Sequence, residues 1–132
     1  MKTVIKTLKA PAGKGPFVQA VAYQKLLFTS GQIGQTVALE LKAKTIQDQS
    51  EQVMNNLREV LEAGNSSMSN VIKTTCYLTD MDNFGEFNKV YKKHFDGLPL
   101  PARSCVEVSR LPKSREVLVE VEAIAYQNEP KE

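Results

Sequence analysis

The stretch TIQDQSEQVMNNLREVLEAG, residues 45–64, decides the fold of this chain. Apolar side chains recur in it at helical spacing and form one stripe, which consists of Ile46, Val53, Leu57, Val60 and Leu61. Thr45 precedes Asp48 by three residues, as at a capped helix start, and Gly64 suits the left-handed position that ends a helix. The stretch therefore predicts a helix over residues 45–63 with one face against a core.

The block that follows predicts a strand and a second helix. Residues 71–78 alternate, and one side of that strand would carry Ile72, Thr74, Cys76 and Leu78. A second helix is expected over residues 83–95, capped by Asp80 or Asp82 and ended by the glycine and prolines of residues 97–101.

Shorter apolar segments on both sides of this block predict the remaining strands. They lie at residues 3–7, 17–23, 25–30, 102–108 and 116–126. The order of elements predicts an α+β two-layer sandwich, in which two helices cover one face of a mixed six-stranded sheet. The other face would be partly apolar and would need a partner, and self-association is the simplest way to cover it.

The composition fits a single soluble domain over residues 1–132. The chain carries 17 basic and 15 acidic side chains, and its net charge is +2. No apolar run approaches the roughly 18 residues needed to cross a bilayer, so no membrane partner is expected. One histidine and two cysteines cannot supply the usual four-ligand structural zinc site. The lysines that precede Glu40 are spaced singly, and we do not expect nucleic-acid binding.

The cysteines and the N-terminus favour a cytoplasmic location. Cys76 and Cys105 form no CxxC motif, and residues 1–13 lack the continuous apolar core of a secretory signal. Reduced thiols in the cytosol are therefore expected. Lysines and threonines near the N-terminus leave a mitochondrial location open.

The last two strands carry side chains that could do chemistry. Alternation places Arg103 and Cys105 on one face of their strand and Glu120 on the polar face of the other, so the three could share one face of the sheet. Arg103 could grip a carboxylate and Glu120 could orient a water molecule. The alternative is a purely structural Arg–Glu pair, which spacing alone favours. Cys105 would need an activating base to act as a nucleophile, and a small polar strand residue is the simpler interpretation.

Three further positions have both a functional and a structural interpretation. Asn88 lies on an otherwise apolar stripe of the second helix, where it could contact a ligand or simply bond to a neighbouring loop. Ser30 and Gly31 end a strand and could offer a hydroxyl and N–H groups to an anion, or form only a turn. His94, near the end of the second helix, is interpreted as structural.

Several segments together resemble the RidA (YjgF) family of enamine and imine deaminases. The most specific are PARSCVEVSRLPK at residues 101–113 and VEVEAIA at residues 119–125. Supporting segments are APAGKGPFVQAV (10–21), TSGQIG (29–34), NNLREVLEAG (55–64) and VIKTTCYLTDMDNFGEFNKVY (71–91). The resemblance implies a chorismate-mutase-like fold, assembled as a homotrimer with active sites between subunits.

The resemblance also implies an activity and a set of site residues. The activity is hydrolysis of 2-iminopropanoate and 2-iminobutanoate to 2-oxo acids and ammonia, which protects pyridoxal-phosphate enzymes and needs no metal or organic cofactor. Catalysis would involve Arg103 as carboxylate clamp, Glu120 for the water and the main chain at Cys105; Phe17, Ser30, Gly31 and Asn88 would bind substrate. Phe17 stands where many members have tyrosine, so a phenolic hydroxyl is missing.

Two other functions remain as alternatives. The protein could be a non-catalytic trimer that binds small 2-oxo or short-chain carboxylic acids, with Phe17 as the reason for lost chemistry. It could also be a ribonuclease or translation inhibitor, a role claimed for some relatives. The single histidine and the isolated lysines argue against the ribonuclease.

Overall fold

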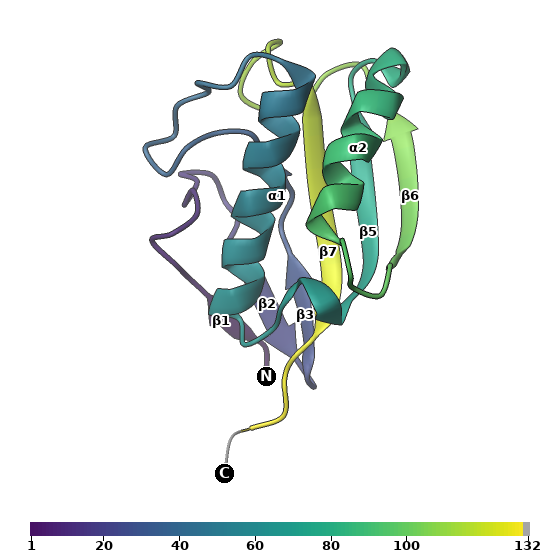
Figure 1. The fold of residues 1–132 in the computed structure, drawn as a ribbon. Helices are drawn as coiled ribbons and strands as arrows, with labels where there is room; N and C mark the ends of the chain where they lie inside the picture. Colours follow the sequence, from purple (N-terminus) through teal and green to yellow (C-terminus); the bar gives the residue numbers. More distant parts are fainter. Residues whose placement is uncertain (131–132) are drawn as a thin grey trace.

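The computed structural model describes residues 1–130, and the last two residues of the predicted domain lie outside them. Two helices lie on one face of a single mixed sheet (Figure 1). The helices are α1 (Ile46–Ala63) and α2 (Phe84–His94), with short 3-10 turns η1 (Met68–Asn70) and η2 (Met81–Asn83). The strands are β1 (Thr3–Ile5), β2 (Ala20–Tyr23), β3 (Leu26–Thr29), β4 (Gln32–Ile33), β5 (Val71–Leu78), β6 (Ala102–Glu107) and β7 (Val119–Tyr126).

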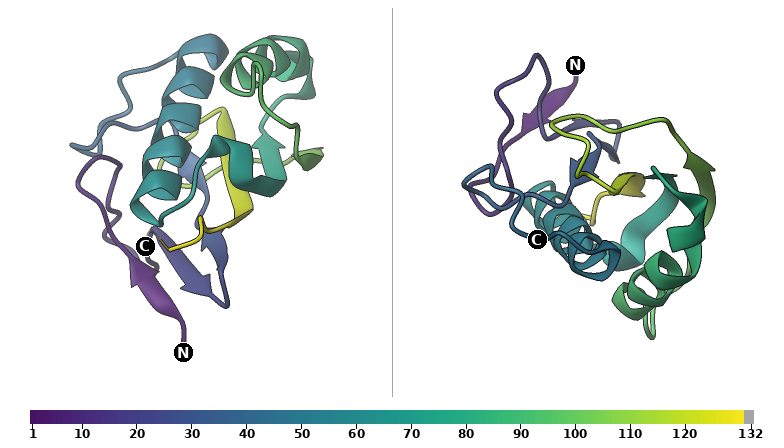
Figure 2. Two further views of the ribbon diagram at one scale, coloured as in Figure 1. Left: turned by 60° about the horizontal axis from the view of Figure 1, so that its bottom comes forward. Right: turned by 90° about the horizontal axis from the view of Figure 1, so that it is seen from above.

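The sheet runs in the order β1-β2-β3-β7-β5-β6. Among the described residues only β5 and β6 pair in parallel, and the remaining pairs are antiparallel. The predicted α+β sandwich with both helices on one face is confirmed, and Figure 2 shows the two layers from two further directions. The six predicted strands form this path, and the sheet adds a seventh, β4, whose two residues pair with β7. In the described residues 1–130, no helix is long and apolar enough to span a membrane.

The core lies between the helices and β7. The predicted stripe of α1 is buried, and every second residue of β7 from Val119 to Ala125 is buried against the helices. Each large aliphatic side chain buried in this way stabilises the fold by about 1.5–3 kcal/mol. The core therefore fixes which face of β7 points toward the helices and which points away.

We call the opposite side of the sheet the open face; none of the helices in residues 1–130 covers it. One row of cross-strand partners on it consists of Val4, Val21, Phe28 and Ile124. Val4 and Phe28 are exposed, as is Val106 on β6. The open face is therefore partly apolar, as predicted, and single chains leave this surface in contact with water.

The end of α1 differs from the sequence prediction. Gly64 has a φ of −90°, so it is not the left-handed residue, and Asn65 takes that role with a φ of 60°. Asparagine tolerates this conformation better than most side chains. Gly64 is needed for a different reason, because a Cβ there would lie 2.7 Å from Cδ2 of the buried Leu27.

Two local predictions around β5 and α2 are also corrected. A register shift between Val71 and Lys73 turns Ile72 outward, so it is exposed while Thr74, Cys76 and Leu78 are buried. Asp80 accepts a hydrogen bond from the Asp82 N–H and caps the η2 turn rather than α2. The cap residue of α2 itself, Asn83, makes no side-chain capping bond.

Candidate active site

The prediction that Arg103 and Glu120 share one sheet face is wrong. Arg103 pairs with Thr74 of β5, which in turn pairs with Ala123 on the helix-covered face. Glu120 pairs with Tyr77 of β5, on the open face. Alternation defines two faces for each strand, but the register of the intervening β5 decides which faces coincide. In a single chain the two side chains point to opposite sides of the sheet.

Arg103 is held in a shallow pocket by α2. Its Nη1 donates a 2.7 Å hydrogen bond to Asn88 Oδ1. Its guanidinium carbon lies 4.7 Å from the Tyr91 ring centroid and 5.4 Å from that of Phe84. The pocket has a volume of about 310 Å³, and we call it the arginine pocket; its lining consists of Asn88, Tyr91, Lys92, Leu100, Pro101 and Arg103. Amide and rings fix the guanidinium plane, which suits it to bind a carboxylate with two parallel hydrogen bonds.

Cys105 lies next to Arg103 on the same face but is not poised as a nucleophile. It is half-buried against the core. Burial raises the pKa of its thiol, although the charge of Arg103 works in the other direction. Burial raises the pKa of the neighbouring Cys76 to about 12. Both thiols are therefore protonated at neutral pH, which favours the interpretation of Cys105 as a polar strand residue.

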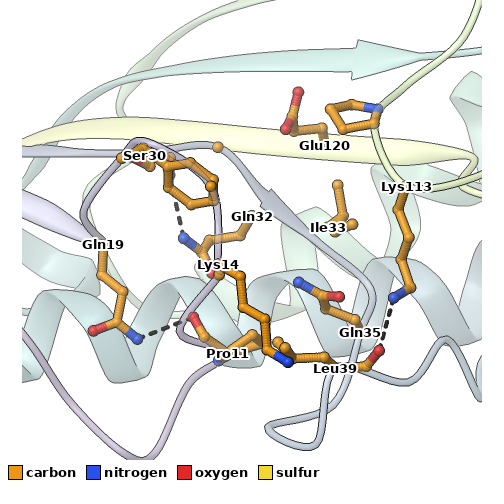
Figure 3. A pocket seen from close by; sticks show the side chains of 15 residues that line it. Pro11, Lys14, Gln19, Ser30, Gln32, Ile33, Gln35, Leu39, Lys113 and Glu120 are labelled. Atoms are coloured by element: carbon orange, nitrogen blue, oxygen red, sulfur yellow. Dashed lines mark hydrogen bonds between the residues drawn. The ribbon is translucent and has the colours of Figure 1, made fainter.

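Glu120 lies at a second, larger cavity on the other side of the sheet (Figure 3). This cavity has a volume of about 600 Å³, and we call it the glutamate cavity. Phe17, Ser30 and Gly31 line it together with Glu120. A Cβ at Gly31 would lie 2.6 Å from Glu120 Oε1, so a larger residue there would displace the carboxylate from its present position. Within residues 1–130, no residue lines both cavities.

The surroundings of Glu120 favour its neutral form. Burial raises the pKa of its carboxyl group, and the charge of Glu122 raises it further. Tyr77 donates a 2.5 Å hydrogen bond to Glu122 Oε1. That bond raises the pKa of Tyr77 to about 12, so the phenol stays protonated. A carboxylate with a raised pKa is a stronger base, which suits Glu120 to accept a proton from water.

The loop that carries Phe17 is fixed by one buried amide. Gln19 Oε1 accepts from the Thr7 N–H at 2.8 Å, and its Nε2 donates to the carbonyls of Ala10 at 3.1 Å and Pro11 at 3.0 Å. The Ser30 hydroxyl donates to the Val18 carbonyl at 2.5 Å. These bonds hold the loop over the end of β3, and they leave the exposed Phe17 ring at the mouth of the cavity.

With this geometry in view, comparison with known proteins decides the family. Residues 7–127 match the family model described as Endoribonuclease L-PSP. The chain is 41% identical to the mouse protein named 2-iminobutanoate/2-iminopropanoate deaminase, over 96% of this chain and 93% of that one. The chain belongs to the RidA (YjgF) family.

Solved structures of other RidA-family proteins have the same fold. The Rid protein YyfA from Yersinia pestis has a TM-score of 0.91 and 38% identity, covering 96% of this chain and 99% of that one. Escherichia coli TdcF with bound serine has a TM-score of 0.89 and 40% identity, with the same two coverages. The architecture described above is therefore the family architecture.

The structure divides the RidA-family residues expected from the sequence between two places. Arg103, Asn88 and Cys105 lie on or beside the helix-covered face, and the first two line the arginine pocket. The remaining residues line the glutamate cavity; they are Phe17, Ser30, Gly31 and Glu120. His94 lies at neither cavity, and its Nε2 contacts Glu51 Oε2 of α1 at 3.1 Å, which supports its structural interpretation.

Two supporting residues were missed by sequence reasoning, Gln49 and Asn56 of α1. Both are buried polar side chains on the core side of the helix. Asn56 Nδ2 donates to the carbonyls of Ile33 at 3.0 Å and Gln35 at 2.9 Å, and so holds β4 at the floor of the glutamate cavity. The two residues are seven positions apart, so both amides lie on the same side of the helix as the apolar stripe. This spacing is the sequence signal that indicates them.

Proposed function

We propose that this RidA-family protein hydrolyses reactive 2-imino and enamine acids, foremost 2-iminopropanoate and 2-iminobutanoate, to 2-oxo acids and ammonia. The main observation in support is the pair of cavities. One presents the fixed guanidinium of Arg103, and the other presents the half-buried carboxylate of Glu120, whose pKa is raised. The name of the similar mouse protein supports the same reaction. We further propose that the protein acts in the cytoplasm and protects pyridoxal-phosphate enzymes from enamine damage.

We propose that the complete site forms between subunits of a homotrimer. The arginine pocket and the glutamate cavity lie on opposite sides of one sheet, so they cannot close on one small molecule within a chain. The partly apolar open face offers a surface for self-association. A closed ring of three copies would bring Arg103 of one subunit against Glu120 of the next.

In this site each group has a distinct task. Arg103, oriented by Asn88, binds the substrate carboxylate and so places the imine carbon beside Glu120. Glu120 takes a proton from a water molecule while the water oxygen forms a bond to the imine carbon. Glu120 returns this proton to the nitrogen, which gives a carbinolamine. Glu120 then takes the hydroxyl proton and passes it to the amino group; the C–N bond breaks, the nitrogen leaves as ammonia, and the carbonyl of the 2-oxo acid forms. Phe17, Ser30 and Gly31 wall the pocket.

The test is the hydrolysis of 2-iminopropanoate generated in situ. We expect the wild type to accelerate 2-oxo acid formation, and Arg103→Ala to lose about 100-fold or more, because the substrate is no longer placed. Arg110→Ala is the matched control, since Arg110 is an exposed arginine outside both cavities. A wild type that gives no acceleration would contradict the proposal, as would an Arg103→Ala variant with an undiminished rate.

The same experiment separates the two alternatives from the deaminase. Tight binding of 2-oxobutanoate without turnover would identify a binding protein, in which Phe17 lacks the needed hydroxyl. RNA cleavage that survives Arg103→Ala in nuclease-free preparations would identify a ribonuclease. The contact of His94 with Glu51, away from both cavities, leaves neither cavity with a histidine base and favours the deaminase.

A further inference from the structure

In a single chain, the glutamate cavity is larger than the proposed small imines require. Its volume is about 600 Å³, and pockets of roughly 300–1,000 Å³ usually enclose ligands the size of drug molecules. 2-Iminopropanoate would occupy only the part next to Glu120. The rest of the cavity extends along Ile33 and Gln35 to Leu39 and Lys113.

The far part of the cavity carries positive charge. Lys14 and Lys113 both line it, and Figure 3 shows their side chains extending toward Leu39, away from Glu120. Within residues 1–130 neither lysine forms an ion pair, and Glu120 is the one acidic residue in the lining. We call Lys14, Lys113 and Leu39 the lysine end. Two ammonium groups that have no acidic side chain as partner, at one end of a cavity, suit an anionic ligand.

The backbone of the lysine end is strained. Leu39 has a φ of 64° and Lys113 a φ of 83°, a region that side-chain-bearing residues rarely adopt. The Lys113 ammonium donates a 2.7 Å hydrogen bond to the Leu39 carbonyl and ties the two strained residues together. Backbone strain of this kind gathers at ligand sites. The lysine end therefore has a defined shape as well as charge.

We propose that the lysine end binds a second anionic group of the substrate, so that 2-imino dicarboxylic acids are substrates of this protein. The inference rests on the proposed function. One carboxylate would be held by Arg103 of a neighbouring subunit beside Glu120, the carbon chain would follow Ile33, and the second carboxylate would reach Lys14 and Lys113. Lys14 is the cleaner residue to test, because Lys113 also supports the Leu39 backbone.

The first measurement uses the products, which are stable. We expect calorimetry to show that 2-oxoglutarate or 2-oxoadipate binds the wild type about tenfold more tightly than 2-oxobutanoate at low salt, and that high salt weakens this preference. Lys14→Met should reduce the preference and Lys14→Glu should abolish it, with 2-oxobutanoate binding unchanged. Lys9→Met is the matched control, since Lys9 is an exposed lysine outside the cavity. Equal affinities in the wild type, or a preference that Lys14→Glu leaves intact, would overturn the inference.

The second measurement uses the imines themselves. Amino acid oxidases generate 2-iminoglutarate or 2-iminoadipate, and 2-iminopropanoate, in situ. We expect Lys14→Glu to lower kcat/KM for the dicarboxylic imines about tenfold and to leave that for 2-iminopropanoate unchanged. An equal effect on both classes would contradict the lysine end as a specificity site. Hydrolysis of no imine would contradict the proposed function instead, and the binding measurement would still decide the ligand chemistry.

Discussion

Glu120 combines a functional position with a cost in stability. Folding raises its pKa above the ordinary value of 4.5, chiefly by burial and then by the charge of Glu122. Ionising the group is therefore harder in the folded chain than in the unfolded chain. Its effect on folding is most favourable below pH 4.5, and this advantage is lost as the pH rises through the raised pKa.

We therefore predict that Glu120→Gln stabilises the protein at neutral pH while removing its activity. Thermal unfolding at pH 7 should give a higher Tm for the variant than for the wild type, and the difference should shrink as the pH falls toward 4.5. Glu59→Gln, a half-exposed position on α1, serves as the control. A Tm difference for Glu120→Gln that does not depend on pH would contradict this account.

Asn88 is predicted to act as a positioning residue for the Arg103 guanidinium. Its carbonyl oxygen accepts one N–H of Arg103 and leaves the positive charge available. Asn88→Asp would keep that hydrogen bond but neutralise the guanidinium. We expect the KM for 2-iminopropanoate to rise about tenfold or more, with a smaller change in kcat, because binding of the substrate carboxylate is weakened.

A merely structural role for Asn88 gives a different result. Asn88→Asp would then leave KM unchanged, since the bond to Arg103 is kept. Asn55→Ala, a half-exposed asparagine on α1, is the control for loss of an amide on a helix. Inhibition by 2-oxobutanoate should weaken in parallel with KM, which separates a binding defect from a slower chemical step.

At the scale of elements, the sequence predicts which face of a helix or strand is buried, because that face is set by the spacing of apolar residues. The stripe of α1 and the alternation of β7 were predicted correctly because each buries one continuous apolar face. Whether Arg103 and Glu120 lie on the same side of the sheet could not be predicted, since this depends on the register of β5 between β6 and β7. The split of the site residues between two cavities follows from that register. The roles of Gln49 and Asn56 were missed because polar residues at buried positions interrupt an apolar pattern.

Gln49 shows how such an interruption holds elements together. It is fully buried, its Oε1 accepts from the Leu118 N–H at 2.8 Å, and its Nε2 donates to the Glu116 carbonyl at 2.7 Å. One amide thus fastens α1 to the segment leading into β7. Gln49→Leu would remove the partner of both part-buried backbone groups, at about 1–3 kcal/mol each.

We predict that Gln49→Leu lowers the free energy of unfolding by about 2–4 kcal/mol. Gln47→Leu on the same helix should change it by about 0.5 kcal/mol or less, because the Gln47 side chain is exposed and, within residues 1–130, bonds only to Glu86. Urea denaturation of both variants measures the difference. Similar midpoints for the two variants would show that β7 does not depend on the buried amide.

At the scale of the whole molecule, one sheet separates the two halves of the proposed site. The helix-covered side presents the guanidinium and the open side presents the carboxylate, so the two groups of one chain point away from each other. If the sites of a trimer lie between subunits, trimers that contain two different inactive variants can have complete sites. An Arg103→Ala subunit still offers an intact Glu120, and a Glu120→Gln subunit still offers an intact Arg103.

We therefore predict that co-assembling the two inactive variants restores activity. When the two variants mix randomly in equal amounts, the subunit that supplies position 103 to a site has an intact arginine with a probability of about 0.5. The subunit that supplies position 120 has an intact glutamate with the same probability. About one quarter of the sites would be complete, so 2-iminopropanoate hydrolysis should recover to about one quarter of the wild-type rate. Co-assembly of Arg103→Ala with the double variant Arg103→Ala/Glu120→Gln should restore nothing, because every site then lacks Arg103. If confirmed mixed trimers show no recovery, both residues of a working site would have to come from one chain. The register of β5 places the two side chains of one chain on opposite sides of the sheet. Absence of recovery would therefore contradict the proposal that Arg103 and Glu120 act together in catalysis.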